Sequence, residues 1–183
     1  MDTYTRYLID RKNRIEAVND GWWAFAGQNH GEKLMNEIVL YRDISSFIAC
    51  GRCQELYDML IESVRENKKA INFSFRCDSP EKRRYMKMEM IPMGQGKVEF
   101  TSYLEREEER TPVDILELLG ERERSKEILM ICSWCKRIRV EEEQWLDTEE
   151  AVEKMELFHS ARLPKLSHGI CPDCYRQLIK KIT

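Results

Sequence analysis

Two pairs of cysteines in the last third of the chain have the spacing of a metal site. Cys132 and Cys135 form one pair, Cys171 and Cys174 form the other, and two residues separate the members of each. Two intervening residues let a tight turn aim both sulfurs at one ion, with backbone N–H groups turned toward the sulfurs. Two such turns supply the four thiolates of a tetrahedral site, which leaves no position for water or substrate. The sequence therefore predicts a structural zinc ion held by these four cysteines.

His168 is an alternative ligand, because it lies three residues before Cys171 and a site of three cysteines and one histidine is chemically ordinary. The paired spacing favours the four cysteines, with His168 as a neighbouring or capping residue. Strand-like Ile138 and Val140 follow the first pair, and Pro172 suits the first turn of a helix that carries the second pair. This order is similar to that of a treble-clef zinc site. The pairs are about 35 residues apart, more than the roughly 15–20 residues of a compact four-cysteine finger.

A third pair with the same spacing, Cys50 and Cys53, is interpreted differently. It could be a redox pair or half of another metal site, but Cys77 is the one further cysteine available to it, so we expect ordinary packing. Catalytic dithiol chemistry would require a thioredoxin-like βαβ context around one of the three pairs, and the sequence lacks it. Covalent c-type haem is excluded, because no pair is followed directly by a histidine.

The composition of the 183 residues limits the partners that we expect. The formal net charge is −3 and the isoelectric point about 5.8, so no general attraction to phosphate backbones or anionic lipid is indicated. We find neither an apolar run of signal-peptide length near the N-terminus nor eighteen consecutive apolar residues anywhere. We therefore expect a cytoplasmic protein without a membrane segment. In that compartment the seven cysteines are metal ligands, redox groups or small core residues more often than disulfides.

Apolar periodicity in the first part of the chain predicts an α+β fold. Residues 7–19 have the pattern of a β-hairpin, and residues 54–67 carry apolar side chains every four positions, as in a helix with one buried face. Alternating strands follow at 71–77, 86–90 and 98–104, and a glycine-bearing turn joins the last two. This order predicts an antiparallel sheet with helices on one face.

The order of these elements, and a short signature within them, resemble the PAS family of sensory domains. That family commonly ends its early strand pair in Val-Asn before an aromatic residue and a glycine. The matching positions here are Ile15, Val18-Asn19, Phe25 and Gly27. The resemblance covers roughly residues 5–104. It implies a domain that receives a signal or binds a protein partner or a second copy of the chain, with a ligand that the sequence does not identify.

We accordingly divide the chain into three parts. Residues 1–104 form the PAS-like domain, residues 105–127 a charged helical linker, and residues 128–183 a small zinc-bound α+β module. The linker combines a run of Glu and Arg with a helix expected from Val113 to about Lys126. The cysteine-bearing segments, ICSWCKRIR and later SHGICPDC, are similar to a C-terminal segment of bacterial sensory proteins that carry PAS-like domains.

The function that these parts indicate is signalling or regulatory binding. No enzyme is predicted, because the sequence lacks a phosphate-cradling glycine loop, a nucleophile elbow and an HExxH motif. A zinc-dependent regulator that binds nucleic acid is the main alternative, since cations lie near the proposed ion. These cations are Lys136, Arg137, Arg139, Arg176, Lys180 and Lys181. From Ile128 onward, however, nine Lys and Arg balance nine Asp and Glu, so nucleic acid is not favoured. A thiol redox protein is a weaker alternative.

Overall fold

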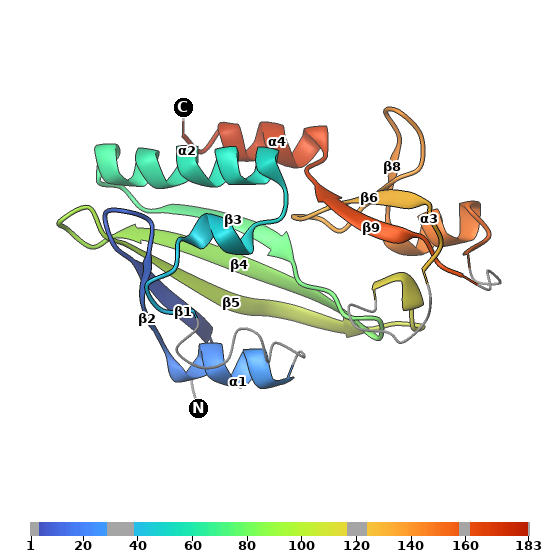
Figure 1. The fold of residues 1–183 in the computed structure, drawn as a ribbon, viewed down its shortest axis with the longest axis horizontal. Coiled ribbons are helices and arrows are strands. Elements are labelled where there is room, and N and C mark those ends of the chain that lie inside the picture. Colours follow the sequence, from blue (N-terminus) through green and yellow to red (C-terminus); the bar gives the residue numbers. More distant parts are fainter. Residues whose placement is uncertain (1–3, 29–38, 117–123, 158–161, 183) are drawn as a thin grey trace. The chain divides into compact units, whose positions relative to one another are not determined.

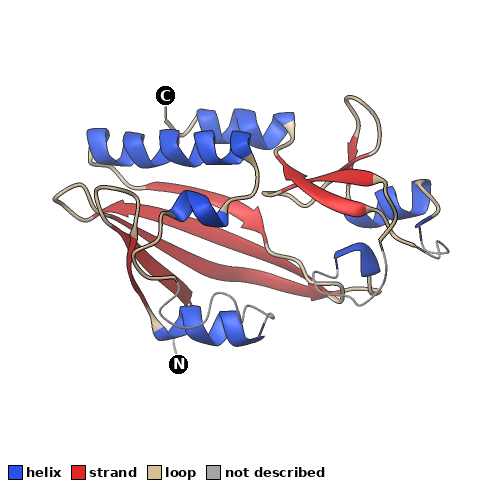
Figure 2. Ribbon diagram, viewed as in Figure 1, coloured by secondary structure: helices blue, strands red, loops and turns tan. Residues whose placement is uncertain are grey.

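Two β-sheets organise the described part of the chain, one of five strands and one of four (Figures 1 and 2). The computed structural model describes residues 4–28, 39–116, 124–157 and 162–182. The chain divides into two units, each of which combines segments that are separate in the sequence. Unit 1 comprises Met1–Ser74, Met86–Glu105 and Leu178–Thr183, and unit 2 comprises Phe75–Tyr85 and Arg106–Gln177.

The five-stranded sheet is antiparallel, as predicted, and has the strand order β2-β1-β5-β4-β3. Its strands are β1 (Tyr4–Ile9), β2 (Ile15–Val18), β3 (Ile71–Arg76), β4 (Lys82–Pro92) and β5 (Val98–Glu109). β1 is the junction, because Tyr7 lies opposite Val18 on one side and opposite Phe100 on the other. The early hairpin and the three later strands are thereby joined into one sheet.

Helical segments lie between β2 and β3 in the chain. Among the described residues these are α1 (Asp20–Gln28), the 3-10 helix η2 (Ile44–Phe47) and α2 (Gly51–Asn67). The helix predicted at 54–67 is confirmed and begins three residues earlier. Its side chains Leu56, Leu60 and Val64 are fully buried, and the ring of Tyr57 lies 6.5 Å from the ring of Phe100. α2 therefore packs its apolar face against the sheet of unit 1.

A tight turn at Asn19 and Gly21 joins β2 to α1. The buried Asn19 side chain accepts hydrogen bonds at Oδ1 from the N–H groups of Arg6 (2.8 Å) and Trp22 (3.0 Å). Its Nδ2 donates to the carbonyl oxygen of Tyr4 (3.1 Å). A Cβ atom on Gly21 would lie 2.0 Å from that same oxygen. The turn therefore requires glycine at position 21, because any side chain would collide with the backbone of β1.

A four-stranded sheet of order β8-β7-β6-β9 organises unit 2. Its strands are β6 (Ile128–Cys132), β7 (Ile138–Arg139), β8 (Trp145–Leu146) and β9 (Lys165–Gly169), with helices α3 (Thr148–Lys154) and α4 (Pro172–Ile179). β6 is parallel to β9 and antiparallel to β7. A small apolar core lies within this unit. It contains Val113, Ile115, Leu116, Ile131, Ile138, Ala151, Val152 and Leu157.

The structure differs from the charged helical linker that we expected after residue 104. β5 continues to Glu109, because the charged residues of this stretch pair with β4. Glu107 forms ion pairs with Lys82 (2.6 Å) and Arg84 (2.8 Å). The alternation of Glu and Arg therefore belongs to an extended strand and not to a solvated connector.

The expected helix from Val113 to about Lys126 also differs from the structure. Within its described residues only Asp114–Leu116 is helical, as the 3-10 helix η3, and residues 117–123 lie outside the described part of the chain. Val113, Ile115 and Leu116 are buried in the core of unit 2. Their burial makes this segment part of a packed unit.

A buried ion-pair network holds the loop between β3 and β4 within unit 2. Asp78, whose side chain is fully buried, contacts the guanidinium groups of Arg76 and Arg110, which are 9% and 8% exposed. Arg76 also pairs with Asp147 (3.4 Å), and its backbone N–H donates to the carbonyl oxygen of Trp134 (2.6 Å). Trp134 lies between the first two candidate ligands, so this loop is fastened directly to the cysteine-bearing turn.

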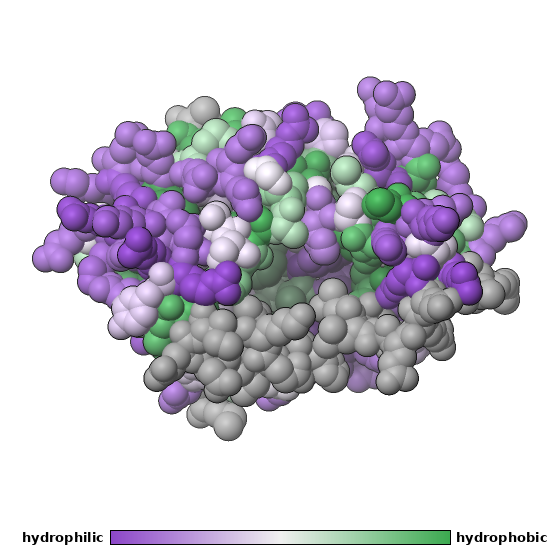
Figure 3. Space-filling model, viewed as in Figure 1, coloured by the Kyte–Doolittle hydropathy of each residue, from purple (hydrophilic) through white to green (hydrophobic). Residues whose placement is uncertain are grey.

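Hydrophilic side chains predominate among the described residues on the face drawn in Figure 3, which agrees with a charged fraction of 34%. None of the helices in the described part of the chain is both long enough and apolar enough to cross a membrane.

We expect Gly21→Ala to destabilise unit 1 by about 2 kcal/mol or more, because the new Cβ collides with the Tyr4 carbonyl and the turn must move. Gly51→Ala is the matched control, since a Cβ there meets no atom within 4 Å and alanine is the better helix former. Denaturant unfolding of both variants measures the difference. Equal stability of the two would contradict this account of the turn.

Asp78→Ala should lower the free energy of unfolding by about 3–5 kcal/mol, because it removes the fully buried carboxylate that the buried guanidinium groups of Arg76 and Arg110 share. Glu141→Ala is the control, since Glu141 is 67% exposed and pairs with Lys154, so its loss should cost about 1 kcal/mol or less. Urea unfolding followed by tryptophan fluorescence compares the two variants. A loss for Asp78→Ala no larger than the control's would show that the network does not stabilise the unit.

Candidate metal centre

The four cysteines predicted as ligands converge in unit 2. The Sγ atoms of Cys132, Cys135, Cys171 and Cys174 all lie within 4.8 Å of one another, and none of the four is in a disulfide. The Sγ atoms of Cys135 and Cys171 are 3.7 Å apart. A tetrahedral ion with metal–sulfur bonds of about 2.3 Å requires sulfur–sulfur edges of about 3.8 Å. The donor set therefore fits a tetrahedral thiolate site.

A tight turn between β6 and β7 presents the first pair. The N–H of Cys132 donates to the carbonyl oxygen of Arg137 (2.8 Å), and the N–H of Lys136 donates to the carbonyl oxygen of Cys132 (3.0 Å). Lys136 adopts the left-handed backbone conformation (φ 62°), which turns the chain back into β7. Oγ1 of Thr148 donates to the carbonyl oxygen of Lys136 (2.7 Å) and holds that conformation.

The parallel pairing of β6 with β9 brings the second pair to the first. Gly169, the last residue of β9, lies opposite Cys132, and its carbonyl oxygen accepts a hydrogen bond from the N–H of Ser133 (2.8 Å). A Cβ atom on Gly169 would lie 2.7 Å from Sδ of Met130, so the close approach of the two strands requires glycine. Cys171 follows two residues later and enters the site directly before α4.

Backbone N–H groups point at two of the sulfurs. The N–H of Cys171 donates to Sγ of Cys132 (3.4 Å), and the N–H of Cys174 donates to Sγ of Cys171 (3.4 Å). Such contacts stabilise the negative charge of thiolates. Hydrogen bonds from the thiols of the other three cysteines lower the pKa of Cys132. The pKa values of Cys135 and Cys174 are raised, because each thiol proton is held by Cys132. A metal ion would take the place of these shared protons.

His168 lies outside this group of ligand atoms. It sits in β9 opposite Ile131 of β6, and its side chain is exposed. Partial burial and the charge of Lys136 lower the pKa of His168. The alternative ligand set of three cysteines and His168 is therefore not the one that this structure assembles.

The arginines close to the cysteines are engaged in ion pairs. Arg137 contacts Asp173 (3.2 Å) and Asp147 (3.9 Å), and Arg176 contacts the same Asp173 (2.6 Å). Carboxylates thus already occupy guanidinium groups that a phosphate backbone would need.

The third cysteine pair differs from our expectation of ordinary packing. Cys50 and Cys53 are joined as a disulfide at the start of α2. Two intervening residues in a first helical turn bring their Cα atoms to 5.0 Å, within the range that a disulfide spans. Cys77 is a free, half-buried cysteine of unit 2, and burial raises the pKa of its thiol. None of these three cysteines belongs to the four-cysteine group.

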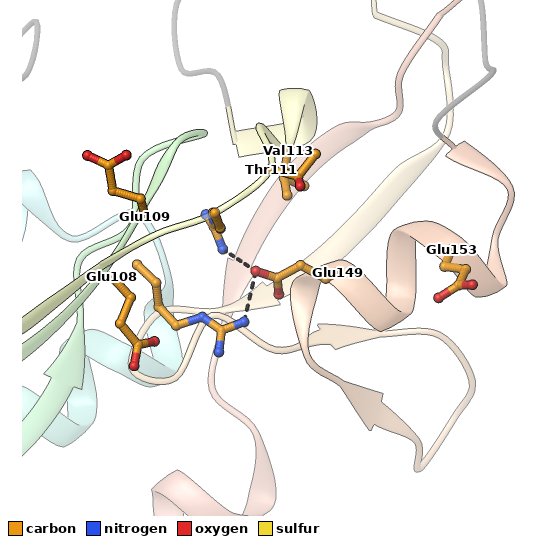
Figure 4. Close-up of a pocket in the computed structure, with 8 residues that line it drawn as sticks. Glu108, Glu109, Thr111, Val113, Glu149 and Glu153 are labelled. Atoms are coloured by element: carbon orange, nitrogen blue, oxygen red, sulfur yellow. Dashed lines mark hydrogen bonds and ion pairs between the residues drawn. The ribbon is translucent and has the colours of Figure 1, made fainter.

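A pocket of about 500 Å³ lies elsewhere in unit 2 (Figure 4). It is lined by Arg83, Glu108, Glu109, Arg110, Thr111, Val113, Glu149 and Glu153. Glu149, in the first turn of α3, bridges Arg83 (2.8 Å) and Arg110 (2.9 Å). Desolvation raises the pKa of Glu149, but the hydrogen bonds from both arginines outweigh it and lower the pKa to about 2. This pocket was not predicted, because the run of Glu and Arg at residues 105–110 has the pattern of a solvated connector.

Comparison with known proteins gives no family for this chain. No family model matches it, and no curated protein matches it. One solved structure that is similar in part is a domain of an HTR-like protein from Haloarcula marismortui ATCC 43049. It shares 14% identity with a TM-score of 0.41, over 57% of this chain and 100% of that chain.

Replacing Glu149 with glutamine should remove an acid-sensitive contribution to the stability of unit 2. The folded-state pKa of about 2 lies below the ordinary value of 4.5, so the contribution is present above pH 4.5 and is lost as the pH falls toward 2. Solvent screening limits it to about 1 kcal/mol or less, since the side chain is 31% exposed. Denaturant unfolding of the wild type and of Glu149→Gln between these pH values measures it. Glu153→Gln, on the same pocket wall, is the control, and a difference that does not shrink in acid would contradict the assignment.

Proposed function

We propose that this chain is a signalling or regulatory binding protein in which a PAS-like domain is joined to a module stabilised by one structural zinc ion. The observation that carries the proposal is the convergence of four cysteine sulfurs, from two turns distant in the sequence, within 4.8 Å of one another. Its metal-binding part follows from the chemistry of these donors. Its sensory part follows from the order of elements in the five-stranded sheet.

Zinc is the ion that suits these donors best. Thiolates are soft ligands, and a tetrahedral set of four thiolates is typical of structural zinc, with iron–sulfur centres as the other common occupant. Four protein ligands leave no position for water or substrate, so the ion would join the turn between β6 and β7 to the start of α4. Unit 2 has a small apolar core, and modules of this kind gain much of their folding free energy from the ion.

The PAS-like assignment is supported by the order and pairing of the elements. β1 and β2 precede the helices, β3 to β5 follow them, and all five strands join in one antiparallel sheet. Asn19, a residue of the PAS-like signature, closes the turn into α1 with three hydrogen bonds. In this proposal residues 1–104 receive a signal or bind a partner protein or a second copy of the chain. Residues 128–183 hold the ion, and the protein works in the cytoplasm without catalysis.

A zinc-dependent regulator that binds nucleic acid is the alternative function. The ion pairs argue against it, because Arg137 and Arg176 share Asp173. The segment from Ile128 onward is formally neutral, and a zinc ion with four thiolates adds a charge of about −2. A surface of this charge has little attraction for a phosphate backbone.

The full chain purified without chelator should carry one zinc ion. Cys132→Ser removes a fully buried ligand and should lose the ion, with a loss of more than about 3 kcal/mol in the free energy of unfolding of unit 2. Elemental mass spectrometry and thermal unfolding with and without a chelator measure both effects. Because thiols must deprotonate to bind the ion, zinc should be released as the pH falls.

Cys77→Ser is the matched control for this experiment, since Cys77 is a free cysteine outside the group. It should keep the ion and most of the stability. Equal zinc content in the two variants would contradict the metal site. So would alkylation of the four clustered thiols, in the native protein, as fast as that of Cys77.

The regulatory role is tested on the same full-length protein. Native mass spectrometry should report zinc together with a dimer or a bound small molecule, as a sensory domain requires. Titration with duplex DNA at low and high salt should give no salt-dependent binding. Affinity that falls steeply with salt would favour the nucleic-acid alternative.

A further inference from the structure

The disulfide between Cys50 and Cys53 occupies the N-terminus of a long helix. Cys50 is the N-cap residue of α2, which runs for 17 residues from Gly51 to Asn67. Its Sγ accepts a hydrogen bond from the N–H of Cys53 (3.2 Å). That N–H group, and the positive end of the helix dipole, both favour negative charge on the sulfur of Cys50. The N–H of Cys53 and the helix dipole therefore stabilise the reduced form of the pair, in which Cys50 is a thiolate.

The two cysteines are both buried but differ in exposure. Cys53 is 1% exposed, whereas Cys50 is 9% exposed. The residues between them, Gly51 and Arg52, are both exposed, and a Cβ atom on Gly51 would meet no atom within 4 Å. The turn that follows Cys50 is therefore exposed to solvent. Because Cys50 is the more exposed cysteine and borders this turn, we assign to it the attack by an external thiolate.

We propose that Cys50 and Cys53 are a reversible thiol–disulfide couple that exchanges two electrons with a dithiol or glutathione-type partner. In reduction, a thiolate of the donor dithiol attacks the sulfur of Cys50, the bond between the two cysteines breaks, and Cys53 leaves as a thiolate that takes up a proton. The donor's second thiolate then attacks the donor's first sulfur, which is bonded to the sulfur of Cys50 in the mixed disulfide. This releases Cys50 as a thiolate, and the donor departs as a cyclic disulfide. Oxidation runs the same steps in reverse and starts from the Cys50 thiolate.

This couple is separate from the candidate metal centre. Neither cysteine belongs to the four-sulfur group, and both lie in unit 1. Their chemistry also differs, because the four clustered cysteines are free thiols whereas this pair is oxidised. A failure of the zinc assignment would therefore leave the proposed redox couple unaffected.

The couple lies next to a segment that can respond to it. Gln54 follows Cys53, and its Nε2 donates to the carbonyl oxygens of Ser45 (3.0 Å) and Ile48 (2.6 Å). The first turn of α2 thus holds η2 and the chain that leads to Cys50. Opening the disulfide frees the backbone of this turn, so hydrogen exchange of residues 44–54 reports the redox state.

The experiment uses the full chain with its metal in place. The protein is equilibrated without oxygen in buffers of reduced and oxidised dithiothreitol at a series of ratios, quenched in acid, alkylated and mapped by peptide mass spectrometry. The peptide with Cys50 and Cys53 should gain two alkyl groups together as the buffer becomes more reducing, and should lose both on return to the oxidised buffer. Amide exchange of residues 44–54 should be faster in the reduced protein.

Single variants test the order of attack. Cys53→Ser should take up one glutathione at Cys50 from oxidised glutathione, whereas Cys50→Ser should leave the buried Cys53 unmodified. The double variant with both serines should keep the labelling pattern of the other five cysteines and show no redox-dependent exchange at residues 44–54.

Three results would overturn the proposal. One is a disulfide that persists in the folded protein under excess dithiothreitol, which would make it a fixed cross-link. A second is a pair that stays as two thiols in fully oxidised buffer. The third is glutathione captured by Cys53 in the Cys50→Ser variant as readily as by Cys50 in its counterpart, which would contradict the assigned attack.

Discussion

The pairing of β6 with β9 is the interaction on which unit 2 depends. These strands lie about 35 residues apart in the chain, and their parallel register sets Cys132 opposite Gly169. The turn after β6 and the start of α4 then meet at one point. Gly169 allows the approach, and the N–H of Cys171 donates to the sulfur of Cys132 across the junction. The cysteine cluster is thus a product of strand register, and an ion bound there would fix that register in return.

Unit 2 contains more of the chain than the segment around the cysteines. It includes residues 75–85 and begins again at Arg106, so β4 and β5 each contribute residues to both units. The buried carboxylate of Asp78 binds Arg76 and Arg110 from two separate segments. A complete set of charges of this kind gives little net stability, but it makes the loss of any one member costly. The network therefore specifies one arrangement of these segments.

Local periodicity and cysteine spacing carried most of what the sequence predicted correctly. Leu56, Leu60 and Val64 predicted α2 because a buried helix face repeats every four residues. The CxxC spacing predicted the clustering of the four cysteines because a tight turn brings both sulfurs of a pair together. Asp20-Gly21 has the pattern of a cap and turn, but the strict requirement for glycine at position 21 was not predicted. What requires Gly21 is the carbonyl oxygen of a paired strand, which no local pattern reveals.

Long-range partners account for the other differences. The Glu and Arg residues after position 104 have the sequence pattern of a solvated connector. In the structure, however, Glu107 accepts a hydrogen bond from Lys82, which lies 25 residues earlier. The disulfide at the start of α2 was not predicted either. A reducing compartment argues against disulfides in general, but the first turn of a helix places two cysteines at this spacing within bonding reach.

X-ray absorption at the zinc edge of the purified full chain measures the coordination of the bound ion. We expect a single shell of four sulfur atoms at about 2.3 Å from zinc, with no nitrogen or oxygen atoms in that shell. A shell that includes nitrogen or oxygen, or a protein that arrives without zinc and with its clustered cysteines joined to one another, would contradict the four-thiolate site.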